Sequence, residues 1–316
     1  MPPKLTFHAN GKVLLSGEYL VMDGALALGL PLNLGQRMSV SEGSGSEIIW
    51  ESIRPDGETW FTGKFDLFGF DPIKTSDKAL AQTLKEIFEA AVRLNSDFLS
   101  KWRKYRVSTQ LDFEPEWGLG SSSTLISCIA EWADVDSFDL MEHTFGGSGY
   151  DIACAKAKGP IFYQLDDEGY TYEYADFAPA FGDQLYLVYT GKKQNSRDQI
   201  SYYRDQEVSS RQVDEISQIT RSLCNVDDLK CFNELLNEHE QIIASILNQT
   251  PVKEKHFKDF WGAVKSLGAW GGDFVLVTSN RSSEETRAYF NQKGFEVFFR
   301  YEEIAISQST VSQANP

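Results

Sequence analysis

Residues 117–124 read WGLGSSST: two glycines flank a leucine, and three serines lead into an apolar run. Glycine permits close backbone approach and unusual dihedral angles, and a helix N-terminus supplies free N–H groups with a partial positive charge. The stretch therefore fits a phosphate-binding loop, in which Gly118 and Gly120 form the turn and the serines open a helix. Serine hydroxyls can add hydrogen bonds to phosphate or bind Mg²⁺. The alternative is a glycine turn with a serine N-cap.

The composition favours a soluble protein of two domains. The chain has 316 residues, more than one core usually organises, and 41% of them are apolar and 24% charged. A net charge of −16 makes nucleic acid a poor partner, because binding it requires lysine and arginine to neutralise phosphates. There is no run of about 18 apolar residues, so no membrane span is expected.

The four cysteines form no CxxC pair, and Cys128 and Cys154 stand in apolar stretches that predict small buried side chains. A zinc site is not expected, since ligands at metal spacing are missing. The N-terminal segment lacks the apolar core of a signal peptide. These features together indicate the cytoplasm.

Strands and helices are predicted in both halves of the chain without strict alternation, which favours the α+β class. In the first half, helical spacing occurs at 76–94, with Ser76 or Asp77 as the N-cap, and again at 121–133, and a strand is predicted at 105–113. A domain boundary is expected near 176–183. In the second half, helices are predicted near 197–222, 228–248, 253–267 and 281–294, and strands at 183–191, 272–279 and 295–302.

Two further stretches place polar residues in apolar surroundings. In GKVLLSGEYLVMDG (11–24), Lys12 opens a strand, where it can also be an ordinary exposed lysine. Glu18 stands in an apolar run, where a carboxylate is expected to be paired or functional. In SLGAWGGDFVLVTS (266–279), Gly268, Gly271 and Gly272 precede a buried strand. They indicate either a tight turn or a second backbone wall at the same ligand.

Together the three stretches resemble the motifs of the GHMP kinases, the superfamily of galactokinase, homoserine kinase, mevalonate kinase and phosphomevalonate kinase. ANGKVLLSGEYLV is similar to the first motif, PEWGLGSSS to the phosphate loop and KSLGAWGGD to the third motif. Each motif is weak alone, but their order and spacing agree. The resemblance implies a domain like ribosomal protein S5 domain 2 at 1–179, a ferredoxin-like domain at 180–307 and a flexible tail at 308–316.

The resemblance also implies an ATP- and Mg²⁺-dependent kinase. GGSGYDIACA (146–155) matches the segment that carries the general base, which would be Asp151, although a helix N-cap is the alternative. Lys12 would stabilise charge and keep Asp151 ionised. Mg²⁺ would bind Ser122, with Ser121 as the alternative hydroxyl. Glu142 is the nearest carboxylate for a second ligand, with Glu131 further off. The nucleotide would be bound by Gly118, Leu119, Gly120, Ser121, Ser122 and Ser123.

The acceptor implied by segments such as SGYD is mevalonate or phosphomevalonate. Lys192 and Lys193, together with Ser196 and Arg197, could neutralise an anionic substrate or form a solvated basic turn. Nucleotide and acceptor would meet between the two domains. The predicted substrate-binding residues are Glu18, Tyr19, Ser148, Ser196, Arg197, Gly268 and Gly271.

The sequence departs from the family pattern at several positions. Asn10 replaces the usual proline of the first motif. Trp117 and Trp270 stand where small residues are favoured, and they could narrow a nucleotide pocket or simply pack against it. Leu140 stands where the family carries a glutamate metal ligand, and Glu142 is the nearest carboxylate.

Two other functions stay open at this point. A lyase like mevalonate diphosphate decarboxylase has the same fold, but such enzymes usually lack the GLGSS form of the loop, so Gly120 argues against it. A protein that binds nucleotide without catalysis is the other alternative, and Lys12 and Asp151 argue against that one. The expected partner is a small-molecule alcohol or phosphate monoester, with no nucleic acid or membrane, and the chain is expected to be a monomer or homodimer.

Overall fold

The computed structural model describes residues 4–191, 196–270 and 272–306, and the chain divides into two compact units. The first unit draws on Met1–Gly11, Leu34–Pro115 and Leu119–Lys156, and the second on Lys12–Asn33, Glu116–Gly118 and Ala157–Pro316. Two long strands, β1 (Leu5–Ser16) and β2 (Ala27–Gly43), contribute residues to both units. The domain boundary near residue 180 stays a prediction.

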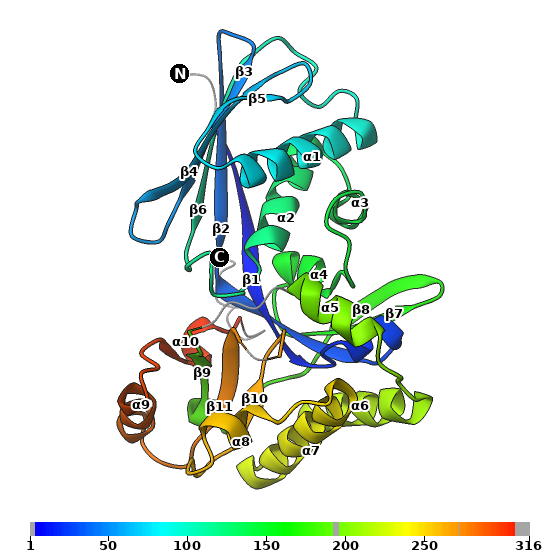
Figure 1. The fold of residues 1–316 in the computed structure, drawn as a ribbon, viewed down its shortest axis with the longest axis vertical. Coiled ribbons are helices and arrows are strands. Elements are labelled where there is room, and N and C mark those ends of the chain that lie inside the picture. Colours follow the sequence, from blue (N-terminus) through cyan, green and yellow to red (C-terminus); the bar gives the residue numbers. More distant parts are fainter. Residues whose placement is uncertain (1–3, 192–195, 271, 307–316) are drawn as a thin grey trace, which may run out of the picture. The chain divides into compact units, whose positions relative to one another are not determined.

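The first unit is a sheet with four helices. Its strand order is β5-β4-β3-β6-β2, with β1 paired to β2, and the β3–β6 pair is parallel. Figure 1 shows α1 and α2 on one side of this sheet. The bounds are β3 Glu47–Ile53, β4 Thr59–Asp66, β5 Pro72–Thr75, β6 Lys104–Leu111, α1 Lys78–Leu94, α2 Ser121–Ala133, α3 Ser137–Glu142 and α4 Tyr150–Lys156.

The core of the first unit lies between the helices and the sheet. Asp77 begins α1 by accepting hydrogen bonds from the N–H groups of Ala79 and Leu80, so it is the cap rather than Ser76. Phe88 of α1 is fully buried, and the rings of Trp50 and Phe65 both lie 5.8 Å from its ring. Aromatic packing of this kind fixes how α1 lies on the strands.

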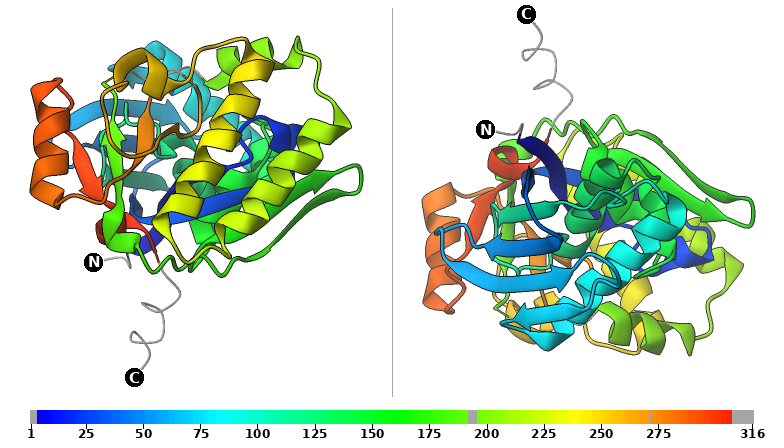
Figure 2. Two further views of the ribbon diagram at one scale, coloured as in Figure 1. Left: turned by 90° about the horizontal axis from the view of Figure 1, so that it is seen from below. Right: turned by 90° about the horizontal axis from the view of Figure 1, so that it is seen from above.

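The second unit contains a hairpin and a four-stranded sheet. The hairpin of β7 (Ile161–Asp166) and β8 (Gly169–Tyr174) pairs with the start of β2, and the second sheet has the order β10-β11-β9-β12. Helices α6 and α7 lie side by side (Figure 2). The bounds are η1 Leu20–Asp23, η2 Gly182–Gln184, β9 Leu185–Tyr189, β10 Val264–Ser266, β11 Phe274–Thr278, β12 Phe298–Arg300, α5 Ser196–Arg204, α6 Ser210–Leu223, α7 Leu229–Leu247, α8 Val252–His256, α9 Ser283–Gln292 and α10 Tyr301–Ile304.

The α+β prediction is confirmed, and the helix expected at 121–133 has those bounds as α2. The helix expected at 253–267 is wrong, because only α8 is helical there and β10 follows it. The helix ends at His256. Further along, a Cβ on Gly262 would lie 1.7 Å from the Thr278 carbonyl oxygen, so the backbone there runs directly against β11. The segment predicted as one helix at 197–222 is two helices, α5 and α6.

Within the described ranges, no helix is both long and apolar enough to cross a membrane.

Candidate active site

The predicted phosphate loop leads into α2 through a left-handed glycine. Gly120 is the N-cap residue, with a φ of 100°, and no side chain caps the helix. The first helical hydrogen bond runs from the Thr124 N–H to the Gly120 carbonyl, at 2.9 Å. The three preceding serine N–H groups therefore lie at the helix end, where they can bind an anion. The alternative of a serine N-cap is wrong, because glycine occupies that position.

The three serines of this loop have different surroundings. The Ser123 hydroxyl is buried and donates to the Gly120 carbonyl at 3.0 Å, so it serves the helix itself. Ser122 is exposed and Ser121 is half-buried. Leu119, just before the turn, is buried and anchors the loop in the first unit. Ser121 and Ser122 are thus the two hydroxyls that remain available to a ligand.

Asp151 lies in the first turn of α4, which packs against α2. It is half-buried, and its Oδ1 accepts from the Ile152 N–H at 3.1 Å. Tyr150 already belongs to the helix, so Asp151 is not its N-cap. Gly147 and Gly149, on either side of the half-buried Ser148, have φ values of 117° and 86°. This segment is a turn that few other residues could form.

The predicted metal ligands are both exposed. Ser122 lies at the start of α2, and Glu142 is the last residue of α3. In the part of the chain that the structure describes, no group of three or more His, Cys, Asp or Glu could hold a metal ion. Mg²⁺ commonly takes one or two protein ligands together with water and substrate phosphates. Each of these two exposed side chains therefore has the type of oxygen that Mg²⁺ arriving with a nucleotide could take as a ligand.

We call the segment between β10 and β11 the glycine-rich turn. Gly118 meets the end of this turn within the second unit. Gly118 has a φ of 72°, and a Cβ there would lie 2.5 Å from the Asp273 Cγ. The Asp273 carbonyl accepts from the Thr190 N–H at 2.8 Å. Lys12 Nζ donates to the Gly118 carbonyl at 3.3 Å. The second and third motifs are therefore in direct contact through Gly118 and Asp273.

The two tryptophans pack inside the second unit. Trp117 contacts the rings of Tyr189, Phe274 and Phe299, at 5.5 to 6.1 Å between centroids. The Trp270 side chain is buried, at 2% exposed, and the backbone N–H of Trp270 donates to the hydroxyl of Tyr19 at 2.9 Å. Both side chains thus behave as the packing alternative expects.

Tyr19 is a buried anchor with a strained backbone. Its φ is 63° with a ψ of −53°, a positive φ that non-glycine residues rarely adopt. The ring stacks on that of Tyr203 at 5.2 Å, and the hydroxyl accepts from Trp270. The packing holds the strained conformation in place. A role of Tyr19 at the substrate stays a prediction.

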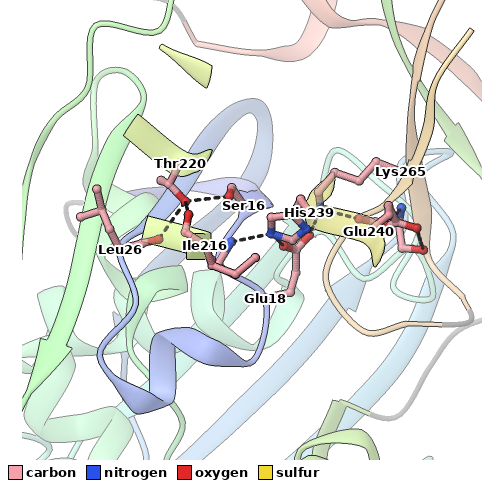
Figure 3. A network of polar contacts seen from close by, with 10 residues as sticks. Ser16, Glu18, Leu26, Ile216, Thr220, His239, Glu240 and Lys265 are labelled. Atoms are coloured by element: carbon pink, nitrogen blue, oxygen red, sulfur yellow. Dashed lines mark hydrogen bonds and ion pairs between the residues drawn. The ribbon is translucent and has the colours of Figure 1, made fainter. Parts of the chain in front are cut away.

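Glu18 lies in a fully buried polar cluster (Figure 3). Lys265 Nζ forms an ion pair with Glu18 Oε1 and also donates to the Ser266 carbonyl at 2.9 Å. His239 Nε2 lies 3.1 Å from Glu18 Oε2 and accepts from the Gly17 N–H at 3.1 Å. Glu18 is therefore paired, as one of the two sequence alternatives expects. We call Glu18, His239, Glu240 and Lys265 the Glu18 cluster.

The pKa values in the Glu18 cluster follow from burial and from Lys265. Burial alone would raise the pKa of Glu18, but the adjacent Lys265 ammonium outweighs it and holds that pKa below its ordinary value. Burial, reinforced by Lys265, lowers the pKa of His239, so the ring is neutral near pH 7. Burial raises the pKa of Glu240 to about 8. Glu240 therefore keeps its proton at neutral pH.

Solved structures match the chain over nearly its whole length. The mevalonate kinase of Methanococcus jannaschii has a TM-score of 0.71 at 16% identity, with 97% of this chain and 99% of that chain covered. The mevalonate kinase of L. major in complex with R-mevalonate has a TM-score of 0.69 at 16% identity, with 97% and 98% covered. The phosphomevalonate kinase of Streptococcus pneumoniae, in complex with phosphomevalonate and AMPPNP, has a TM-score of 0.68 at 16% identity, with 94% and 99% covered.

The chain has the fold of the GHMP kinases. No protein-family model and no curated protein matches its sequence. Structures of a galactokinase and of a heptose 1-phosphate kinase also have the GHMP-kinase fold. The fold therefore confirms the resemblance predicted from the three motifs, and it leaves the acceptor open.

Three residues of the Glu18 cluster were not identified from the sequence: His239, Glu240 and Lys265. A signal existed for Lys265, which stands within the third GHMP-kinase motif between Val264 and the glycines. Glu240 falls on the apolar face of α7, among buried residues. A charged residue at such a position is expected to have a partner, but its partners lie elsewhere in the chain.

Only some of the remaining predicted substrate residues fall within the described part of the chain. Gly268 does, and its φ of 69° is in keeping with a tight turn. Gly271, Lys192 and Lys193 lie outside the described residues, and so do the side chains of Ser196 and Arg197.

Proposed function

We propose that the protein is an ATP- and Mg²⁺-dependent kinase that transfers the γ-phosphoryl group of ATP to mevalonate or phosphomevalonate. The observation that carries the proposal is the uncapped N-terminus of α2 behind the left-handed Gly120. A mevalonate kinase bound to R-mevalonate and a phosphomevalonate kinase bound to phosphomevalonate and AMPPNP have the same fold. The choice of acceptor rests on the sequence motifs, which favour the mevalonate and phosphomevalonate kinases.

The α2 N-terminus would bind the nucleotide phosphates. Its N–H groups and the partial positive charge of a helix of 13 residues favour an anion. This matters because a chain with a net charge of −16 repels phosphate at long range. Backbone donors at short distance, together with Lys12, would overcome that repulsion.

Asp151 would accept the proton of the acceptor hydroxyl as its oxygen forms the new bond to phosphorus. Lys12 would stabilise the negative charge that develops on the transferred group. Bound ATP would supply the phosphoryl group, and Mg²⁺, held by Ser122 and Glu142, would neutralise charge on the phosphates. The ADP oxygen leaves as the bond to the γ-phosphorus breaks.

A panel of acceptors tests the proposal. Purified protein is supplied with ATP, Mg²⁺ and, separately, mevalonate, phosphomevalonate and galactose, and ADP release is followed by a coupled assay. ADP is expected with mevalonate or phosphomevalonate and not with galactose. Turnover with galactose alone would overturn the acceptor, and no turnover with any of them would overturn the kinase. CO₂ release from mevalonate diphosphate would support the lyase instead.

A further inference from the structure

All four side chains of the Glu18 cluster are almost completely buried. Glu18, His239, Glu240 and Lys265 are 1%, 0%, 3% and 0% exposed. They come from three places in the second unit: the segment after β1, helix α7 and strand β10. Removing charges from water costs several kcal/mol per ion unless pairing compensates, so such a cluster persists only where its geometry is good.

Each contact of the cluster fixes a backbone segment. Lys265 joins the Glu18 carboxylate to the Ser266 carbonyl, and Glu240 Oε1 accepts from the Ser266 N–H at 3.0 Å. His239 holds the Gly17 N–H at 3.1 Å. The cluster thereby secures both the segment after β1 and the start of the glycine-rich turn.

Two neighbouring contacts complete this attachment. The Trp270 N–H donates to the Tyr19 hydroxyl, which joins the far end of the described turn to the segment after β1. Ser16 and Thr220 share a hydrogen bond of 2.7 Å between their hydroxyls, which joins the same segment to α6 (Figure 3). The turn is thus held at Ser266 and at Trp270.

The charges of the cluster do not balance if every carboxylate is ionised. Lys265 supplies one positive charge, and His239 is neutral. Glu18 takes the ion pair, so Glu240 must stay protonated. The charged groups with the largest effect on the Glu240 carboxyl are Lys265 of β10, which lowers its pKa, and Glu18, which raises it. Loss of the Glu240 proton would leave two buried carboxylates competing for one ammonium group.

We propose that Lys265 is a positioning residue whose ion pair with Glu18 holds the glycine-rich turn in place, and that ionisation of Glu240 releases this hold. Any effect of this ion pair on activity rests on the proposed kinase function, with the turn lining the substrate site as the sequence predicts. Its effect on the turn itself concerns the second unit alone. The two can therefore fail separately.

Hydrogen exchange of the Gly17 and Trp270 amides in the full chain, followed by NMR, tests the structural part. Lys265→Met is expected to speed exchange at both amides by about tenfold or more, since their local opening no longer breaks an ion pair. Lys253→Met is the matched control: Lys253 is a half-buried lysine of the same unit that donates to the Gly262 carbonyl at 2.6 Å. Equal effects of the two variants, or none in a folded Lys265→Met protein, would overturn the proposal.

A second variant guards against a protein that fails to fold. Glu18→Gln combined with Lys265→Met removes the ion pair without leaving a buried charge. It is expected to fold and still to show fast exchange at Trp270. Slow, wild-type exchange in this double variant would contradict a holding role for the pair.

The role of Glu240 is tested by comparing wild type with Glu240→Gln at each pH, which cancels the intrinsic pH dependence of exchange. The exchange rate of the Trp270 amide in wild type, divided by its rate in Glu240→Gln, should be near one below neutral pH. This ratio should rise as pH passes about 8. A constant ratio would contradict release by ionisation.

The part that concerns activity has its own measurement. Lys265→Arg should preserve the KM for the acceptor better than Lys265→Met, because it keeps the charge. If the wild type has no kinase activity, the proposed function fails while the exchange results still decide the holding role. If activity is present and KM is the same in both variants, the turn does not position the acceptor.

Discussion

The start of α2 and the Glu18 cluster are both polar sites in apolar surroundings, but they use their polar groups in opposite ways. At α2 the N-cap is a glycine, and two serine hydroxyls remain available to a ligand. In the Glu18 cluster each charged side chain contacts protein, and none is more than 3% exposed. The comparison teaches that polar groups left uncommitted at an exposed helix end can serve the proposed nucleotide, whereas committed ones in the interior hold the backbone.

The largest expected effect is on catalysis in the first unit. Asp151→Asn should lower kcat by about 10²–10⁴-fold, since it removes a general base. The melting temperature should hardly change, because the side chain is half-buried and bonds the adjacent Ile152 N–H. Asp139→Asn, which alters an exposed acid of α3, is the control for kcat and melting temperature. Equal kcat in both variants would remove Asp151 from the chemistry.

The next effect is on stability in the second unit. Lys265→Met should lower the free energy of unfolding by about 3–5 kcal/mol, because it leaves the Glu18 carboxylate buried and unpaired. The double variant Glu18→Gln with Lys265→Met should lose less than the single one. Urea unfolding of the wild type, Glu18→Gln, Lys265→Met and the double variant measures the coupling energy between Glu18 and Lys265. Additive losses would mean that the pair does not act as a unit.

A smaller loss of folding stability is expected from a substitution where the phosphate loop meets the glycine-rich turn. Gly118→Ala adds a Cβ 2.5 Å from the Asp273 Cγ, whereas Gly294→Ala adds one at a similar φ with nothing within 4 Å. Both pay for the left-handed backbone, about 1–2 kcal/mol. Gly118→Ala should cost about 1–3 kcal/mol more, because its neighbours must move. Equal losses in thermal unfolding would show that Gly118 matters only for its dihedral angles.

The last expected effect is a change in the pH dependence of stability. Between pH 4.5 and about 8 the folded protein keeps the Glu240 proton that the unfolded chain loses. The folded state then binds more protons, so the contribution of Glu240 to stability falls as pH rises through this range and is lost above about 8. Glu240→Gln should flatten the fall of melting temperature with pH. Parallel curves for the two proteins would contradict the raised pKa.

Local signals in the sequence were enough for α2 and its loop. A glycine pair, three serines and an apolar run predicted both the start of the helix and its buried face, because every one of these signals acts within a few residues. The helix expected at 253–267 was wrong for a related reason. Phe257, Phe260 and Val264 have helical spacing, but all three are buried in one core with β11, and the helix has already ended at His256.

The Glu18 cluster could not be assembled from the sequence. Glu18 and Lys265 are 247 positions apart, and no pattern of spacing connects them. The sequence indicated only that Glu18 needs a partner. It gave no way to choose among 30 lysines and arginines, since that choice depends on how α7, β10 and the segment after β1 pack in space.

The same separation has a consequence for synthesis of the chain. Trp270 and Tyr19 are 251 positions apart, and closing such a long loop costs entropy that only the finished contact repays. During translation the carboxylate of Glu18 has no ammonium partner until Lys265 has left the ribosome. The turn at Tyr19 is thus stabilised late, and a nascent chain that stops short of Lys265 has no means of fixing it.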